Sequence, residues 1–241
     1  MKNFRKLVVV AGVAIAALAS ISSIAVAQEG AKKSKLSTVK LDTEASKLGY
    51  TFGAQIGGQL AGSGLSGDVD IDAVVAAIRD VVGGNEPRMT IEEMQQTQAV
   101  YQQKAQAELA AIAAENQAKG DEYLAINGKA EGVVTGESGL QYTVEREGKG
   151  KQPTAEDTVK VHYAGTLIDG TEFDSSYKRG APADFPVSGV IPGFSEGLQL
   201  MKEGAKYRFV IPAAQAYGEQ GPPSIGPNQV LIFDVELIEV L

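Results

Sequence analysis

The chain has 241 residues, of which 44% are hydrophobic and 22% are charged, a composition typical of a folded protein with one or two domains. Its 30 acidic residues outnumber 22 basic ones, which argues against nucleic acid and anionic lipid as partners, because both attract basic surfaces. The absence of cysteine excludes disulfides, thiol catalysis and cysteine-ligated zinc. Hydrophobic cores alone must therefore hold the fold together.

Residues 1–27 have the three parts of a secretory signal peptide. Lys2, Arg5 and Lys6 precede an apolar run, and the small residues Ala25–Ala27 fit a cleavage site. An uncleaved membrane anchor is the alternative, because the run approaches spanning length. Cleavage removes 3 of the 22 basic residues, so 19 remain against 30 acidic ones and the net charge becomes −11. We expect an exported protein, located in the periplasm, with association with the outer membrane or cell surface as the alternative.

Residues 28–127 are predicted to form an all-α region that begins with two short helices. Asp42 or Thr43 can cap the first helix, whose apolar residues recur at helical spacing. Its glycines weaken it as an isolated helix, and they would allow a second helix to approach closely. Asp70 can cap the second helix, which is predicted to end at Gly83.

A third helix is predicted from Ile91 to Ile126, where no proline interrupts the chain. Thr90 and Glu93 fit a capping box at its start. At 1.5 Å per residue this helix would be about 54 Å long. Its apolar side chains form a narrow seam that needs partners, either the short helices or another chain: Ile91, Met94, Tyr101, Ala105, Leu109 and Ile112. We interpret residues 28–127 as a dimerisation domain with a rigid stalk helix; a solvated spacer helix is the alternative.

Residues 128–241 are predicted to form an antiparallel α+β domain. A short helix is predicted within residues 191–204, and a Pro/Gly-rich loop at residues 217–228 precedes the last strand. Asp169–Gly170 is a signal for a primed two-residue turn in the first hairpin. Alternating apolar residues predict strands within residues 140–148, 157–176, 183–188, 205–212 and 229–241.

His162 is the only histidine and lies beside Tyr163 in the predicted hairpin. Successive side chains of a strand point to opposite faces, so a site lined by Tyr163 would not include His162. One histidine without cysteine makes a transition-metal site unfavourable. The sequence also lacks the motifs of nucleotide-binding loops, serine hydrolases and zinc proteases. We therefore expect no metal and no cofactor.

Four ordered motifs within residues 135–241 resemble the FKBP family of peptidyl-prolyl cis-trans isomerases: VKVHYAGTLIDGTEFDSS, VIPGFSEGLQLMKEGAKYRFVIP, AYGEQG and FDVELIEV. The preceding region, with the joining sequence ESGLQY, is similar to the dimerisation and stalk segments of bacterial Mip/FkpA-like members. The resemblance implies an antiparallel sheet wrapped on one short helix, and rotation about X–Pro bonds in folding exported proteins, with added chaperone activity. A non-catalytic holdase or surface-binding protein that uses the same pocket and a dimer cleft is the alternative.

By the same resemblance, the catalytic residues are Asp174, Tyr163 and Tyr217. The substrate-binding residues that it implies are Phe173, Val190, Ile191, Phe194, Ile225 and Phe233. Simple alternation would send Phe173 and Asp174 to opposite faces, so both can reach one site only at a strand end or a bulge.

Two positions depart from the pattern of the family. Phe194 stands where tryptophan is usual, and Ala183 stands where another aromatic residue is often found. Both changes would affect substrate preference and inhibitor affinity more than the reaction. The partners that the resemblance implies are proline-containing unfolded or folding polypeptides, macrolide immunosuppressant-type inhibitors and a second copy of the chain.

Overall fold

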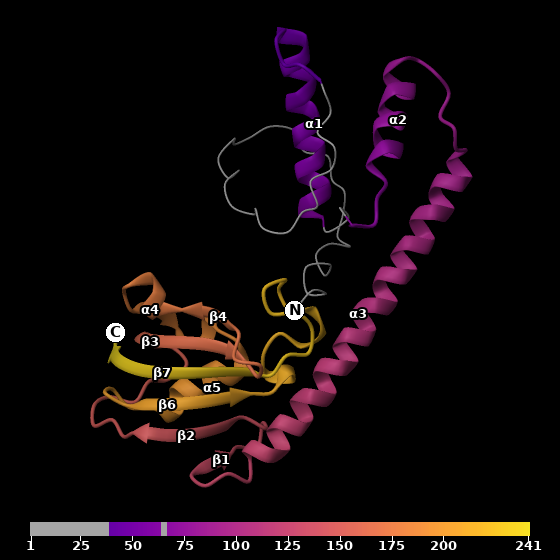
Figure 1. Cartoon of the computed structure of the whole chain (residues 1–241). Coiled ribbons are helices and arrows are strands. Elements are labelled where there is room, and N and C mark those ends of the chain that lie inside the picture. Colours follow the sequence, from indigo (N-terminus) through magenta and orange to yellow (C-terminus); the bar gives the residue numbers. More distant parts are fainter. Residues whose placement is uncertain (1–38, 64–66) are drawn as a thin grey trace. The chain divides into compact units, whose positions relative to one another are not determined.

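The computed structural model describes residues 39–63 and 67–241, so the predicted signal peptide lies outside the described residues. The described residues begin with three helices, α1 (Glu44–Gly62), α2 (Ile71–Val82) and α3 (Ile91–Asn127), shown in Figure 1. Within the described ranges, no helix is both long enough and apolar enough to cross a membrane.

The three helices begin where their capping residues predict. Thr43 caps α1 and shares a capping box with Ser46. The carboxylate of Asp70 accepts hydrogen bonds from the first backbone N–H groups of α2. Before α3, the Thr90 N–H donates to Glu93 Oε2 at 2.8 Å, and the Glu93 N–H donates to Thr90 Oγ1 at 3.1 Å. These bonds satisfy backbone donors that a helix start leaves unpaired.

The chain divides into two compact units that meet between Gln98 and Ala99, so α3 contributes to both. In the first unit, neither α1 nor α2 has a buried residue. Large apolar side chains such as Phe52 and Val81 are exposed there. In the described part of the first unit, α1 and α2 therefore leave large apolar side chains exposed within one chain.

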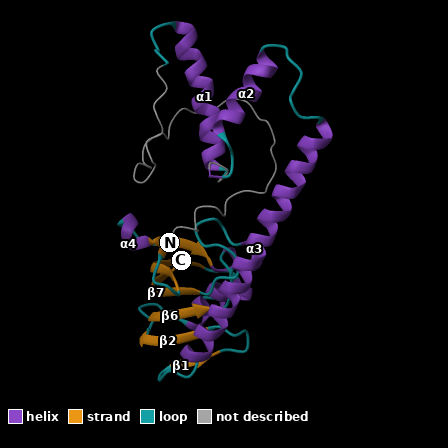
Figure 2. Ribbon diagram, turned by 45° about the vertical axis from the view of Figure 1, so that its right-hand side comes forward, coloured by secondary structure: helices purple, strands orange, loops and turns teal. Residues whose placement is uncertain are grey.

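The second unit is built on a seven-stranded antiparallel sheet, whose strands are seen from two directions in Figures 1 and 2. The strand order is β1-β2-β6-β7-β3-β4, and β5 pairs with β3. The strands are β1 (Val133–Thr135), β2 (Gln141–Arg146), β3 (Thr158–Leu167), β4 (Glu172–Ser175), β5 (Ala183–Pro186), β6 (Lys206–Ile211) and β7 (Leu231–Val240). This arrangement confirms the α+β fold class.

One face of the sheet packs on α5 (Pro192–Leu200), whose Phe194 and Leu198 are buried. Alternate residues of β3 are buried, as expected for a strand with one face in the core. The sequence prediction missed two elements of this unit: strand β1, and helix α4 (Ser176–Arg179), a single turn directly after β4.

The turn between β3 and β4 differs from the prediction. The Gly170 N–H donates to Leu167 O at 3.0 Å, and the Leu167 N–H donates to Thr171 O at 2.9 Å. In the hairpin, only Gly170 has a positive φ, 84°, whereas either kind of primed turn would also require a positive φ at Asp169, the first central residue. The prediction of a primed two-residue turn was wrong, since the loop has three residues and Gly170 takes the left-handed position.

The C-terminal part of α3 packs against the sheet. Tyr123 and Leu124 contact a small buried cluster of Val210, Val230 and Ile232. Figures 1 and 2 both show this part of the helix beside the sheet. The apolar seam predicted from Ile91 to Ile112 did not include these contacts.

Candidate active site

An aromatic cluster surrounds Phe194, which lies in the first turn of α5 and is 4% exposed. Its ring centroid lies 4.9 Å from that of Phe233 on β7 and 6.3 Å from that of Tyr163 on β3. Phe185 on β5 lies at the same 6.3 Å from Phe194. Most of these ring pairs meet edge to face, the arrangement that aromatic quadrupoles favour. The cluster thus joins the helix to three strands.

Phe173 reaches this cluster through a β-bulge. In the ladder between β3 and β4, Gly165 pairs with Asp174 and Thr166 pairs with Glu172, so Phe173 is the extra residue. Its ring lies 5.5 Å from Phe233 at an interplanar angle of 86°. A Cβ atom on Gly165 would lie only 2.7 Å from Phe173 and 2.8 Å from Phe233, so glycine makes room for both rings. The bulge lets Phe173 and Asp174 both become half-buried despite strand alternation.

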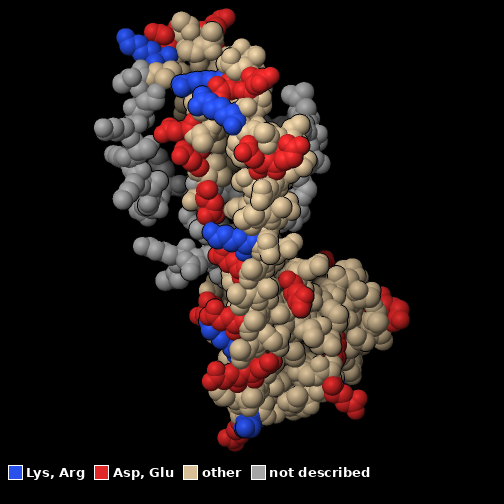
Figure 3. Space-filling view, turned by 90° about the vertical axis from the view of Figure 1, so that its right-hand side faces the viewer, with Lys and Arg blue, Asp and Glu red and all other residues tan. Residues whose placement is uncertain are grey.

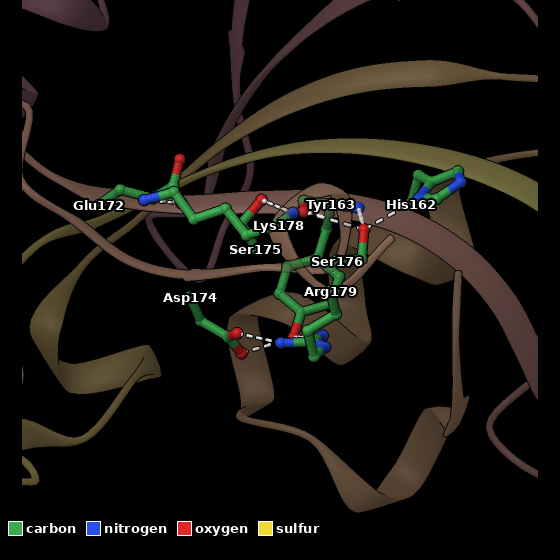
Figure 4. A network of polar contacts seen from close by, with 8 residues as sticks. All are labelled: His162, Tyr163, Glu172, Asp174, Ser175, Ser176, Lys178 and Arg179. Atoms are coloured by element: carbon green, nitrogen blue, oxygen red, sulfur yellow. Dashed lines mark hydrogen bonds and ion pairs between the residues drawn. The ribbon is translucent and has the colours of Figure 1, made fainter. Parts of the chain in front are cut away.

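A closed polar network lies at the edge of the cluster (Figure 4). The Tyr163 hydroxyl donates to Asp174 Oδ2 at 2.5 Å, and it accepts a hydrogen bond from Arg179 Nη2 at 2.8 Å. Arg179 Nη1 forms an ion pair with Asp174 Oδ1. The guanidinium carbon of Arg179 also lies 5.3 Å from the centre of the Tyr163 ring. Each of the three groups therefore fixes the other two.

The network favours a charged carboxylate beside a neutral phenol. Partial burial opposes ionisation of Asp174, but the hydrogen bonds from Tyr163 and Arg179 and the charge of Arg179 together lower its pKa. Burial, followed by the hydrogen bond to Asp174, raises the pKa of Tyr163. At neutral pH Asp174 is thus an anion and Tyr163 keeps its proton. The pair presents fixed dipoles, and neither group is tuned to exchange a proton near neutral pH.

Ser176 supports the network from the other side of β3 and is completely buried. Its Oγ accepts a hydrogen bond from the Tyr163 N–H at 2.8 Å and donates to Tyr163 O at 3.1 Å. The same Oγ lies 3.0 Å from Nδ1 of His162, whose ring stacks on Tyr177 at 4.6 Å. His162 and Tyr163 therefore face opposite ways, as the alternation of the strand predicted.

The remaining predicted residues lie on loops around the cluster. Val190 and Ile191 are half-buried before α5, and Ile225 is 3% exposed in the loop before β7. Tyr217 lies in the loop after β6, and 45% of its surface is exposed. Within the described part of the chain, no hydrogen bond joins its hydroxyl to Tyr163 or Asp174. The structure brings the predicted apolar residues together with Tyr163 in one cluster and holds Asp174 against Tyr163, whereas the side chain of Tyr217 is exposed.

The predicted site omitted three residues that contribute to this arrangement: Arg179, Ser176 and Phe185. Arg179 and Ser176 belong to α4, which the sequence pattern did not reveal. The sequence did contain a signal for this helical turn. Arg179 lies five positions after Asp174 and is followed by Gly180, a residue that can end a helical turn. Phe185 alternates with Ala183 on β5 and could have been placed on the inner face by that spacing.

Comparison with known proteins identifies both regions of the chain. Residues 149–238 match the family model of the FKBP-type peptidyl-prolyl cis-trans isomerase, and residues 45–144 match the domain amino-terminal to that isomerase. An FKBP-type peptidyl-prolyl cis-trans isomerase FkpA from Aeromonas hydrophila is 42% identical over 264 residues, covering 100% of this chain and 96% of the relative. This chain belongs to the FKBP-type peptidyl-prolyl cis-trans isomerase family.

Two further relatives extend the FKBP-type assignment over most of the chain. The outer membrane protein MIP of Legionella longbeachae is 43% identical over 206 residues, covering 83% of this chain and 87% of the relative. The crystal structure of FkpA from Escherichia coli matches with a TM-score of 0.61 and 41% identity, covering 83% of this chain and 97% of that one. The protein is therefore a peptidyl-prolyl cis-trans isomerase with a helical N-terminal region.

Proposed function

We propose that this isomerase accelerates rotation about X–Pro bonds in polypeptides that fold outside the cytoplasm. The observation that carries the proposal is the Tyr163–Asp174–Arg179 network at the edge of an aromatic cluster. Such a site offers apolar surface for a proline ring and oriented polar groups for the amide next to it. It needs neither a metal nor a nucleophile for this reaction.

The chemistry suits such a surface because no covalent bond is made or broken. Rotation about the C–N bond has a barrier of about 18–20 kcal/mol, set by partial double-bond character. Uncatalysed X–Pro isomerisation takes roughly tens to hundreds of seconds. The twisted amide is less dipolar than the planar one, so a dry apolar surface disfavours the planar ground state relative to the transition state.

In the proposed complex, the proline ring packs against apolar side chains of the cluster. Those residues are Phe173, Phe194, Ile225 and Phe233, with Val190 beside them. The Ile191 N–H, just before α5, would donate to one substrate carbonyl and the Tyr217 hydroxyl to another. The Asp174 carboxylate, held by Tyr163, would lie near the twisting carbonyl and orient it by its charge.

Location, domain boundaries and assembly form part of the same proposal. Residues 1–27 would be removed as a signal peptide, residues 28–127 would form the dimerisation domain with its stalk, and residues 128–241 the isomerase domain. The exposed apolar side chains of α1 and α2, such as Phe52, support a homodimer, because such surfaces favour burial against a partner. We place the protein in the periplasm, with outer-membrane association as the alternative that the name of the Legionella relative supports.

Unfolded or folding polypeptides would be its substrates, and two sites in one dimer would add chaperone activity by holding a chain at two points. Macrolide immunosuppressant-type inhibitors would compete for the proline-binding surface. We propose no nucleic acid partner. Figure 3 shows acidic side chains scattered over one face, and the described residues drawn there form no continuous basic patch.

The decisive experiment measures isomerisation of a prolyl peptide by residues 28–241. We expect acceleration over the spontaneous rate, and a fall in kcat/KM of about tenfold or more in Asp174→Ala, which corresponds to ~1.4 kcal/mol of transition-state stabilisation. Phe233→Ala should also lower kcat/KM, because it removes part of the proline-binding surface. Asp184→Ala, an exposed aspartate on β5, is the matched control and should retain wild-type activity.

The outcome separates this proposal from the non-catalytic alternative. A wild-type chain that fails to exceed the spontaneous rate would exclude a catalytic role for the site. If that chain still suppressed aggregation of an unfolded protein, the holdase interpretation would replace ours.

A further inference from the structure

We propose that Asn116 and Gly120 of α3 are positioning residues for isomerisation, because they anchor the loop that carries Tyr217 and Ile225. We call residues 217–230 the site loop. This inference rests on the proposed function, since it assigns to that loop a part of the substrate-binding surface. All the contacts that carry it lie within the unit that begins at Ala99.

One face of α3 holds the outer end of the site loop. Asn116 Nδ2 donates a hydrogen bond to Pro227 O at 2.8 Å. In the opposite direction, Asn228 Nδ2 of the loop donates to Ala113 O of the helix at 3.4 Å. One turn farther along, Gly120 is the only residue of α3 that is buried. Figure 1 shows the yellow loop before β7 beside this part of the helix.

The closeness of the helix to Val230 depends on glycine. A Cβ atom at position 120 would lie 2.8 Å from Val230 Cγ2, which real contacts almost never allow. Val230 is 2% exposed and lies directly before β7. A methyl group at position 120 would therefore force either the helix or the end of the site loop to move.

Bonds within the loop carry this anchoring to the site residues. The Asn228 N–H donates to Gly218 O at 2.8 Å, which ties the outer end of the loop to the residue after Tyr217. The Ile225 N–H donates to Pro222 O at 2.8 Å, which closes a turn around the buried Ile225 side chain. Ile225 lies two residues before Pro227, whose carbonyl oxygen accepts the hydrogen bond from Asn116. A shift of Pro227 would thus move Ile225 against the aromatic cluster.

The same helix is fixed at its end, so it provides a firm support. Gln141 Nε2 donates to Leu124 O at 2.9 Å, and Asn127 Nδ2 donates to Gln141 Oε1 at 2.8 Å. Gln141 belongs to β2 and is buried. The face that begins at Ala113 is therefore attached to the site loop at one end and to the sheet at the other.

The test uses residues 28–241 with Asn116→Ala, and with Gln117→Ala as the matched control. Gln117 is the next residue and is exposed, and its side chain donates a hydrogen bond to Asp121 on the same helix at 2.8 Å. For Asn116→Ala we expect kcat/KM for a prolyl peptide to fall about threefold to tenfold, mainly through a higher KM, as loss of one partly buried hydrogen bond implies. Gln117→Ala should match the wild type.

Two readouts distinguish positioning from general destabilisation. In Asn116→Ala the NMR resonance of the Ile225 δ1 methyl group should shift, and the Asn228 amide should exchange faster with solvent, while the methyl groups of Leu198 in α5 stay unchanged. A second variant, Gly120→Ala, should show the same pattern. Adding Val230→Ala to it should restore part of the activity by removing the clash.

The inference is overturned if Asn116→Ala equals Gln117→Ala in both kcat/KM and the Ile225 resonance. It is equally overturned if activity falls together with the urea midpoint while the Ile225 and Asn228 signals do not change. A wild-type chain without activity would instead refute the proposed function and the catalytic part of this inference, while the NMR signals would still decide whether α3 anchors the loop.

Discussion

The two units of this chain differ in how far their apolar side chains are buried. In the sheet unit, the rings and aliphatic side chains of β3, β6, β7 and α5 bury one another almost completely. In the helical unit, Phe52 on α1 is 58% exposed and Val81 on α2 is 65% exposed. The sheet unit can thus reach a stable fold within one chain, whereas the helical unit has apolar surface to bury against a partner.

This difference in burial suggests a division of roles between the two units. The sheet unit holds the whole polar network and aromatic cluster, so we expect a single chain to be sufficient for isomerisation of a small peptide. The helical unit would serve assembly, and thereby the capture of longer polypeptides. The predictions below test that division, beginning with the largest expected effect.

Truncation of a core ring should affect only the sheet unit. Phe209 is 0% exposed and packs against Phe194, so Phe209→Ala should lower the free energy of unfolding by about 3–5 kcal/mol. Phe52→Ala should leave that unit within about 0.5 kcal/mol of wild type but weaken self-association about tenfold or more. Urea denaturation and sedimentation equilibrium measure the two effects. A smaller solution mass for Phe209→Ala at temperatures where it stays folded would contradict the division.

Removal of a buried hydroxyl should matter more than removal of an exposed one. Ser176→Ala leaves the buried backbone N–H of Tyr163 without its partner, so we expect a loss of about 1–3 kcal/mol in the sheet unit. The matched control is Thr51→Ala in α1, whose hydroxyl donates to Lys47 O at an exposed position. That control should change the unfolding free energy little. Equal losses in both variants would show that the exposed helices are as tightly constrained as the core.

The sequence predicted those parts of the fold that local patterns encode. Capping residues placed the starts of α1, α2 and α3, and alternation placed Tyr163 inside and His162 outside. Pro192 marked the start of α5, whereas the helix ends at Leu200, four residues before the predicted stop signal Gly204. Each of these features depends on neighbours within a few residues, so one sequence is enough to predict it.

The sequence did not predict features that depend on distant partners. A bulge at Phe173 was one of two arrangements that could bring Phe173 and Asp174 to one site, and the choice between them depends on the pairing of β3 with β4. The contact of Arg179 with Tyr163 depends on α4, which the sequence pattern did not reveal. The Asp169–Gly170 pair fits both primed and three-residue turns, so the dipeptide alone could not choose. Most of the site residues came from the resemblance to FKBP proteins, and their roles in substrate binding stay predictions.

Glycines of α1 give a sharper test of assembly. Gly49, Gly53 and Gly57 recur every four residues, and a Cβ atom at any of them would meet nothing within 4 Å in the single chain. If α1 is an isolated exposed helix, Gly53→Ala and Gly57→Ala should each stabilise that helix by about 0.5–1 kcal/mol. If a partner helix packs closely there, as we expect, the double variant should instead raise the dimer dissociation constant several-fold. If circular dichroism shows a higher helix content in the double variant and its solution mass is unchanged, the interface does not lie on the glycine face of α1.

The smallest expected effect is a pH dependence confined to the sheet unit. Hydrogen bonds from Lys151 and from the backbone and side chain of Thr154 lower the pKa of Asp157 from 3.8 to about 2. Because the folded-state pKa lies below the unfolded one, this carboxylate adds stability above about pH 4, and the contribution disappears as the pH falls through 2. The Asp157 carboxylate is partly accessible to solvent and its partner Lys151 is exposed, so the effect is modest and screened by salt. Acid unfolding of Asp157→Asn should show a flatter stability profile between about pH 4 and 2 than wild type, while Glu156→Gln, its exposed neighbour, should follow wild type. A change in solution mass over the same range in Asp157→Asn alone would mean that the two units are energetically coupled.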